Sequence, residues 1–173
     1  MGLNAYRQSS VGSEERLFFL DTAQQATVSG GSVTGGEFHM MFLRAESTNV
    51  ENGISLEETP DVTLKIQPLE PQRGTKQIQY SGVFLKDDPV CKALLKLFDE
   101  NPIGAKAHFY MVEVRTFDSN SATIADVAIV TTAVNADAGD KIKIEATIGY
   151  TSDPVKIAQT VEIDVDEGTL SFS

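Results

Sequence analysis

Two histidines and one cysteine are the side chains of this 173-residue chain that most readily support acid–base, nucleophilic or metal chemistry. His39 and His108 stand in strand-like segments, with no second ligand at metal spacing and no nucleophile-elbow signature beside them. Triads assemble in space, so the sequence does not exclude one, but a structural role is favoured for both rings. Cys91 lies beside apolar residues at the start of a helical segment, which favours a packed thiol. A single cysteine excludes an internal disulfide and a cysteine-based zinc site.

An acidic run near the C-terminus and two glycine pairs are the remaining patterns with chemical meaning. The acids that precede Gly168 are Glu162, Asp164, Asp166 and Glu167. They alternate with aliphatic residues and lack the distal Glu of a calcium loop, so the solvent face of a strand is favoured over a cation site. Gly30-Gly31 and Gly35-Gly36 lack the context of a phosphate cradle and are interpreted as hinges. We therefore expect no enzyme activity, no catalytic residue, no cofactor and no metal.

The balance of charged and apolar residues limits the class of protein further. With 14 Lys and Arg against 25 Asp and Glu the formal net charge is −11, and 41% hydrophobic residues supply the core of one domain. Scattered and outnumbered cations disfavour tight binding to DNA or RNA, which requires a cationic surface. No apolar run approaches the ~18–20 residues of a membrane span, so no membrane partner is expected. No secretory signal is expected either.

Most of the chain alternates apolar and polar residues with the period of two that is typical of half-buried strands. The clearest examples are residues 62–66, 77–84, 142–148 and 155–165. Residues 37–44 and 123–134 are apolar on both faces, which indicates strands that are buried on both sides.

One helix is predicted over residues 89–100. Asp88 supplies the N-cap, Pro89 fits the first helical position, and Asn101-Pro102 ends the helix. Four apolar side chains at positions i, i+4, i+7 and i+8 form the stripe that is expected to face the core: Val90, Leu94, Leu97 and Phe98.

Several strands, regular turns and a single helix predict a mainly β fold, an antiparallel β-sandwich or barrel with one flanking α-helix. No repeat or composition shift marks an internal boundary, so residues 1–173 are expected to form a single domain. Residues 1–14 are polar and rich in Gly and Ser, which predicts a mobile N-terminal arm. Residues 45–60 lack regular periodicity and predict a long polar loop, of a length that is usually functional or disordered.

From residue 61 onward the order of elements resembles the major tail (tail tube) protein of long-tailed bacteriophages with non-contractile tails. The resemblance is carried by the strand 77–84, the helix 89–100 followed by Asn101-Pro102-Ile103-Gly104, the strand 106–112, and the closing segments 140–150, 155–164 and 168–172. In that family a strand likewise feeds a short helix that leads into a long strand.

The resemblance implies a structural virion protein that self-assembles into hexameric rings, and rings that stack into a tube through which DNA leaves without tight binding. It also implies synthesis in the bacterial host cytoplasm, a final place in the phage tail, and contacts with tape-measure and tail-terminator proteins. It carries over no catalytic residue. An acidic lumen is expected, because like charge keeps DNA from adhering.

The 45–60 loop is the candidate contact between subunits. A loop too polar to fold alone can be ordered by binding a neighbour. In that case Val50, Ile54 and Leu56 are the buried anchors, while Glu57 and Glu58 lie at the rim. An ordinary solvated loop is the alternative.

Two other classes of protein stay open at this point. One is a β-sandwich binding module of adhesin or tail-decoration type, although the loops hold few aromatic residues and the chain has no Trp. The other is a small enzyme on a β-barrel, for which the sequence offers no catalytic constellation.

Overall fold

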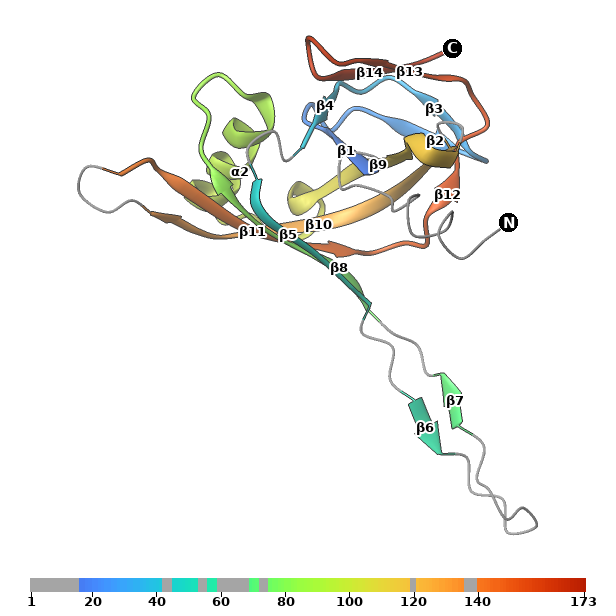
Figure 1. Ribbon diagram of the computed structural model, residues 1–173, viewed down its shortest axis with the longest axis horizontal. Coiled ribbons are helices and arrows are strands. Elements are labelled where there is room, and N and C mark those ends of the chain that lie inside the picture. Colours follow the sequence, from blue (N-terminus) through green and yellow to red (C-terminus); the bar gives the residue numbers. More distant parts are fainter. Residues whose placement is uncertain are drawn as a thin grey trace, which may run out of the picture.

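The computed structural model describes residues 16–41, 45–52, 56–58, 69–71, 75–118, 121–135 and 140–173. Ten of the strands join one antiparallel sheet, in the order β13-β14-β4-β1-β9-β10-β11-β8-β5 with β12 beside β10 (Figure 1). The fold is therefore mainly β with a helix on its flank, as the sequence predicted. Within the described ranges the sheet curves strongly but does not close into a barrel.

The strands in chain order are β1 (Arg16–Asp21), β2 (Thr27–Ser29), β3 (Ser32–Thr34), β4 (Phe38–Met40), β5 (Ala45–Asn52), β6 (Leu56–Glu58), β7 (Leu69–Pro71), β8 (Lys76–Val83), β9 (His108–Arg115), β10 (Ser121–Asn135), β11 (Lys143–Tyr150), β12 (Val155–Lys156), β13 (Val161–Asp164) and β14 (Thr169–Phe172). The α-helix of the described residues is α2 (Pro89–Glu100). Two short 3-10 helices, η2 (Gly104–Ala107) and η3 (Thr116–Asp118), flank β9.

The central strands β1, β9 and β10 send alternate side chains into two hydrophobic cores. In β1, Phe18 and Leu20 enter one core and Phe19 enters the other. In β9, Met111 enters the same core as Phe18, and Val112 enters the same core as Phe19. Because both faces of these strands are covered, their sequences are apolar almost throughout.

The first core, which we call the helix core, lies between β1, β9 and β10 on one side and β8 and β11 on the other, and α2 packs against it. Val90, Leu94 and Leu97 of the helix are at most 7% exposed. Burying a side chain of this size contributes roughly 1.5–3 kcal/mol, so this stripe holds the helix on the sheet.

The helix begins and ends where its sequence predicts. The Asp88 carboxylate accepts the N–H of Val90 at 2.9 Å, and Asn101 ends the helix with a left-handed φ of 42°. The prediction that Phe98 faces the core is wrong, since its side chain is 43% exposed. Cys91 is buried in its place. The buried side of the helix therefore consists of Val90, Cys91, Leu94 and Leu97, and Phe98 lies outside it.

The second core, which we call the outer core, is covered by the β2–β3 hairpin, β4, β14 and the segment after β12. Asp21 is fully buried beside it, and its two carboxylate oxygens accept the backbone N–H groups of Ala26 (2.7 Å) and Glu37 (2.9 Å). Gly31 lies in the hairpin turn with φ +85°, and a Cβ there would lie 2.5 Å from the Lys156 carbonyl oxygen. The close approach of the two backbones therefore requires glycine.

The structure corrects the prediction of a polar loop over residues 45–60. Its first half is β5, which pairs antiparallel with β8 and places Val50 opposite Ile78. Backbone hydrogen bonds to β8 can form a strand without apolar alternation, so the sequence pattern missed it. Residues 56–58 form β6, which pairs with β7. Ile54 lies outside the described residues, as do the predicted arm 1–14 and the predicted strand 62–66.

One predicted strand is divided in two. Residues 155–165 contain β12, which pairs with β10, and β13, which pairs with β14. Between them Ile157 is buried in the outer core, and its N–H donates to the Ala122 carbonyl at 2.9 Å. The alternation across this segment therefore reflects two ladders rather than one.

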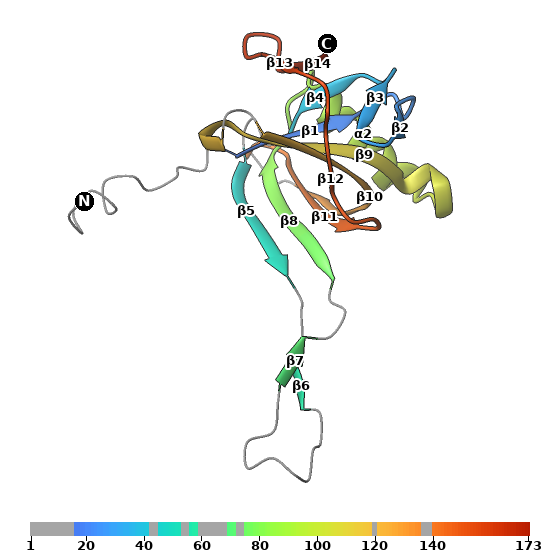
Figure 2. The ribbon, with the colours of Figure 1, turned by 90° about the vertical axis from the view of Figure 1, so that its right-hand side faces the viewer.

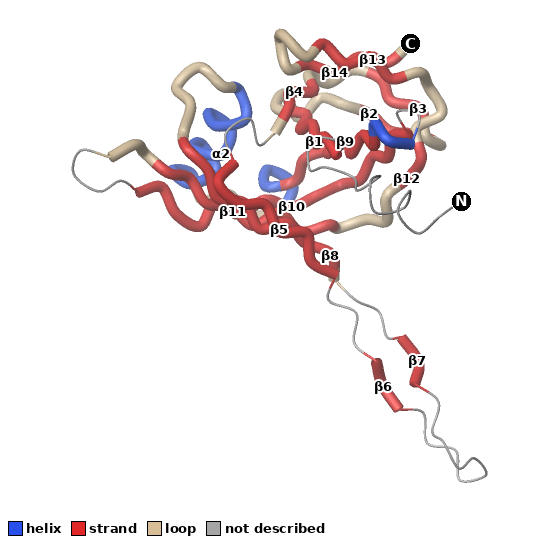
Figure 3. The backbone as a smooth tube through the Cα atoms, in the orientation of Figure 1, coloured by secondary structure: helices blue, strands red, loops and turns tan. Residues whose placement is uncertain are grey.

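A long hairpin leaves the body of the molecule. Figure 2 shows β5 and β8 running side by side at the end of the main sheet, where β8 also pairs with β11, and β6 and β7 form a small ladder beyond their ends (Figure 3). We call β5, β8, β6 and β7 the projecting hairpin.

Candidate assembly surface

In the part of the chain that the structure describes, several strand edges of the main sheet have no partner strand, among them those of the end strands β13 and β5. Two of these open edges lie in the same part of the sheet. β5 stands at the end of the sheet and pairs with β8. β10 pairs with β9 as far as Ala128, and its residues 129–135 pair with β11 alone. The segments β5, β8, β11 and the second half of β10 thus form a sheet that is open on both sides. Open strand edges are templates for pairing with another chain.

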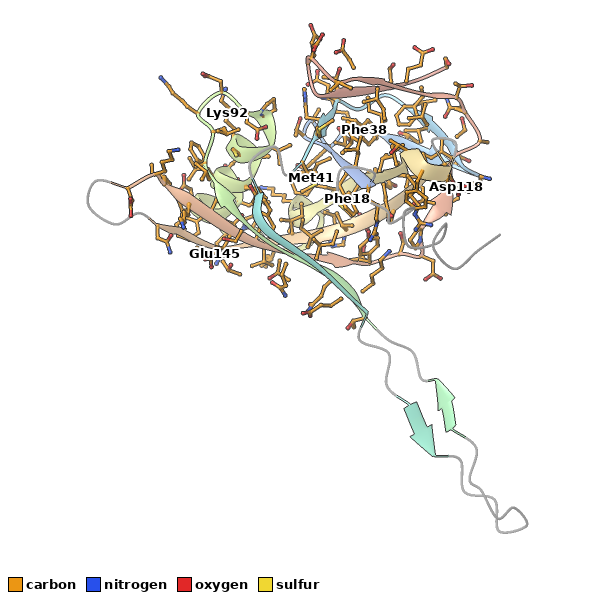
Figure 4. The ribbon with its side chains drawn as sticks, in the orientation of Figure 1. Phe18, Phe38, Met41, Lys92, Asp118 and Glu145 are labelled. Carbon is orange, nitrogen blue, oxygen red and sulfur yellow. The ribbon has the colours of Figure 1, made fainter. Side chains whose placement is uncertain are left out.

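One face of these four segments is mainly polar, although Val130 of β10, which lies opposite Thr147, is also exposed on it. Its side chains on β8 and β11 are those that alternate with the buried residues: Gln77, Gln79, Ser81, Lys143, Glu145 and Thr147. The Thr147 hydroxyl donates to the Gln79 carbonyl oxygen at 2.9 Å, and the Gln77 amide donates to Glu51 at 3.0 Å. In Figure 4, Glu145 lies on the outer side of the sheet and Phe18 lies inside the body. We call this surface the polar face.

A charged cluster closes the helix core at the end away from α2, where β8 begins and β11 ends. Glu113 of β9 has a side chain only 4% exposed, and its Oε1 accepts from Arg16 Nε (3.0 Å) and Arg115 Nε (2.9 Å). Lys76 Nζ lies 4.0 Å from Oε2 of Glu113 and 4.4 Å above the centre of the Tyr150 ring. We call Arg16, Lys76, Glu113 and Arg115 the Glu113 cluster.

The protonation of the cluster follows from its burial and its charges. Burial alone would raise the pKa of Glu113, but hydrogen bonds and charge from Arg115 and Arg16 outweigh it and hold this pKa below its ordinary value. Burial lowers the pKa of Lys76, against the attraction of Glu113. Burial also raises the pKa of Tyr150 to about 12, and its hydroxyl oxygen has no hydrogen-bond partner among the described residues.

The cysteine and the two histidines, which were the candidates for chemical activity, lie in packed or hydrogen-bonded positions of the fold. Cys91 is buried, burial raises the pKa of its thiol to about 11, and the packed role expected for it is confirmed. His108 Nδ1 lies 2.9 Å from an oxygen of Asp126, and His39 is half-buried in β4. Within the described ranges, no three His, Cys, Asp or Glu side chains gather in a way that could hold a metal. The same ranges contain no helix long and apolar enough to cross a membrane.

The acidic residues near the C-terminus are exposed, as expected. Glu162 and Asp164 lie on the exposed side of β13, whereas Asp166 and Glu167 lie in the turn that leads to β14. An oxygen of Asp164 accepts the N–H groups of Asp166 and Glu167, each at 3.0 Å, and fixes the turn. We call residues 164–167 the acidic turn.

The predicted inter-subunit residues lie along the projecting hairpin where the structure describes them. Val50 belongs to β5, and Leu56, Glu57 and Glu58 form β6. Their contact with another subunit stays a prediction.

The sequence pattern did not predict the Glu113 cluster. The one signal was a carboxylate within the apolar run 109–114. Arg16 is 97 positions away from Glu113 in the chain, and no local pattern connects them.

No protein-family model matches the chain, and no curated protein matches it significantly in sequence. The arrangement of its strands and helix is nevertheless a fold of tail tube proteins, as the order of elements had indicated. A chain of the SPP1 tail tube superposes with a TM-score of 0.61 at 13% identity, over 90% of this chain and 81% of that one.

Two further similar structures come from gene transfer agent particles. A chain from the tail of an empty gene transfer agent particle, refined with C6 symmetry, gives a TM-score of 0.61 at 12% identity, over 86% of this chain and all 100% of the other. A chain from the virion of a native gene transfer agent gives 0.50 at 10% identity, again over 86% and 100%. At these identities the likeness establishes the fold.

Proposed function

We propose that this protein is the structural subunit of a tail tube, a self-assembling conduit for DNA in a phage-like particle. The observation that carries the proposal is a fold shared over 86–90% of the chain with chains of the SPP1 tail tube and a gene transfer agent tail. The role is structural and requires no catalytic residue or cofactor.

The two open strand edges support closure into a ring. β5 of one subunit would pair with residues 129–135 of β10 in the next subunit, so that the four segments of each copy continue into one barrel. Such a contact uses a different surface on each partner and closes if the rotation between subunits allows it. The C6 symmetry of the gene transfer agent tail favours six copies in each ring.

The polar face would then line the lumen. Among the side chains that the structure describes, its charged groups are the carboxylates of Glu51 and Glu145 and the ammonium of Lys143, which gives two negative charges against one positive. Amides and hydroxyls supply the rest of its polar surface, so DNA could pass without tight binding. The excess acid of the chain contributes little to this face, and we propose a lumen that is polar and only weakly acidic.

The projecting hairpin would contact a neighbouring subunit or ring. Val50, Leu56, Glu57 and Glu58 lie on its strands, and with Ile54 they remain the proposed contact residues. We also propose that residues 1–173 form one domain, with a mobile arm over 1–14. The mature location would be the virion tail after synthesis in the host cytoplasm, with tape-measure and tail-terminator proteins as partners at its ends.

The test is the assembly state of the purified full chain. Light scattering after size-exclusion chromatography, followed by negative-stain and cryo-electron microscopy, is expected to show hexameric rings and stacked tubes. The map should place β5 beside β10 of the adjacent subunit and the polar face on the lumen. A chain that stays monomeric at every concentration would overturn the proposal and favour a binding module.

A further inference from the structure

Among the described residues, two groups of charged side chains with opposite net charge lie at opposite ends of the subunit. The Glu113 cluster lies at the end where β8 begins and the projecting hairpin leaves the body. The acidic turn lies at the other end, because Glu167 shares a surface hollow with Asp87 and Asp88 at the start of α2, beyond the last residue of β8. Lys86 also lines this hollow, so carboxylates outnumber ammonium groups there by three to one.

The Glu113 cluster has cationic groups left over after its internal contacts. Three cations surround one carboxylate, a surplus of two positive charges, which Asp118 beside Arg115 reduces to one. A guanidinium has five N–H donors. The contacts with Glu113 use two donors of Arg16 and one of Arg115, and these side chains are 36% and 42% exposed. The cluster can therefore accept a further anionic group from outside the subunit.

The acidic turn has the properties of such a group. The bonds to Asp164 hold its backbone in one conformation, so little conformational entropy is lost when the turn binds. Asp166 and Glu167 are exposed. Val165, which follows Asp164 in the chain and precedes both of them, is 76% exposed. Val165 is thus a short apolar side chain flanked by carboxylates. Such a group fits a surface that combines cations with apolar area, and Lys76 over the Tyr150 ring is a surface of this kind.

We propose that the Glu113 cluster of one subunit binds the acidic turn of a second copy of the chain in the next ring. This inference rests on the proposed function and names the surfaces that join successive rings. Charge complementarity between the two ends supports it, and so does the projecting hairpin, which leaves the body at the cluster end and would reach toward the same ring. Every ring then offers an acidic end and a basic end, which gives the stack its polarity.

The test reverses the charge of the acidic turn with Asp166→Lys and Glu167→Lys together. Both side chains are exposed, so the variant should fold and form rings like the wild type. We expect the protein concentration required for tube growth to rise at least about tenfold, because each rim pair contributes modestly and the contact repeats around the ring. The matched control, Asp99→Lys with Glu100→Lys, makes the same charge change on two exposed helix residues and should leave tube growth unchanged.

Two measurements make the result specific. Lys76→Gln on the cluster side should weaken stacking in the same direction, and variant rings with the reversed turn should cap wild-type tubes at one end and shorten them. Tubes of the turn variant that grow like the wild type would overturn the inference while leaving the proposed function intact. Absence of rings and tubes from the wild type would overturn both. Binding of a single-stranded oligonucleotide that is lost in Lys76→Gln, without any change in stacking, would assign the cluster to DNA instead and overturn the inference.

Discussion

The hydroxyl of Thr131 in β10 donates a hydrogen bond to the backbone carbonyl of Leu94 in α2, with 2.8 Å between the two oxygen atoms. Both residues are buried, so this bond joins helix and sheet inside an otherwise apolar core. A buried hydrogen bond is strengthened by the low dielectric around it, and an apolar side chain in its place would leave a polar group of the helix less well satisfied.

Replacing Thr131 by valine keeps the shape of the side chain and removes this bond. We expect the free energy of unfolding in urea to fall by about 0.5–1.5 kcal/mol. The control is Thr132→Val at the exposed neighbouring position, for which a change within about 0.5 kcal/mol is expected. Equal midpoints for Thr131→Val and the wild type would show that the bond adds nothing to stability.

The helix offers a direct comparison between a buried and an exposed apolar residue. Leu94→Ala should lower the free energy of unfolding by about 2–5 kcal/mol, because Leu94 is 1% exposed and its loss leaves a cavity. Phe98→Ala should cost less than about 1.5 kcal/mol, since nearly half of that side chain is already in water. Chemical denaturation of both variants measures the difference. A larger loss for Phe98→Ala would contradict the placement of the helix.

Glu113 makes the stability of the fold depend on pH. Its pKa is lower in the folded chain than in the unfolded chain, so its stabilising effect is complete above the unfolded value of about 4.3 and is lost as the pH falls through the folded value. At neutral pH, Glu113→Gln should lower the free energy of unfolding by about 1.5–3 kcal/mol. The gap to the wild type should narrow once the pH falls below about 4.3.

Urea titrations at several pH values between about 7 and 3 measure this gap. Glu145→Gln on the polar face serves as the control, because that side chain lies outside the cluster and its replacement should change stability little. If the difference in free energy of unfolding between Glu113→Gln and the wild type is the same at every pH tested, the cluster is not the origin of the pH dependence.

The outer part of the projecting hairpin can be removed without cutting the main sheet. β5 ends at Asn52, opposite Lys76 at the start of β8, so replacing residues 54–74 by a two-residue Asn-Gly turn leaves their ladder in register. We expect a folded subunit, checked by circular dichroism and thermal unfolding, that no longer forms tubes in negative stain. Tubes of normal length would show that the hairpin tip has no role between subunits.

Several elements could be predicted because their signals are local. The alternation of Ile78 and Tyr80 with Gln77 and Gln79 predicted β8, and the structure buries the first pair. Asp88, Pro89 and Asn101 predicted the two ends of α2, because caps depend on a few neighbouring residues. The tail tube fold followed from the order of these elements. The hairpin contact residues belong to the interface and are still predictions.

Other features lay beyond local signals. β5 is polar, and only its pairing with β8 makes it a strand. Phe98 was assigned to the core because helical spacing defines a stripe but not its width, and the packing of α2 against the sheet decides which edge of that stripe is buried.

The sequence by itself determined the mainly β class, the helix and the acidic balance of this protein, because periodicity, caps and charge are properties of short segments. Only the tertiary structure decided that Arg16, Lys76 and Arg115 meet at Glu113, and that Asp166 and Glu167 lie at the opposite end. It also decided that, within the described ranges, β5 and the second half of β10 each have a strand edge without a partner. These features depend on the register between strands far apart in the chain, and register is fixed by the joint packing of two cores that no single segment contains.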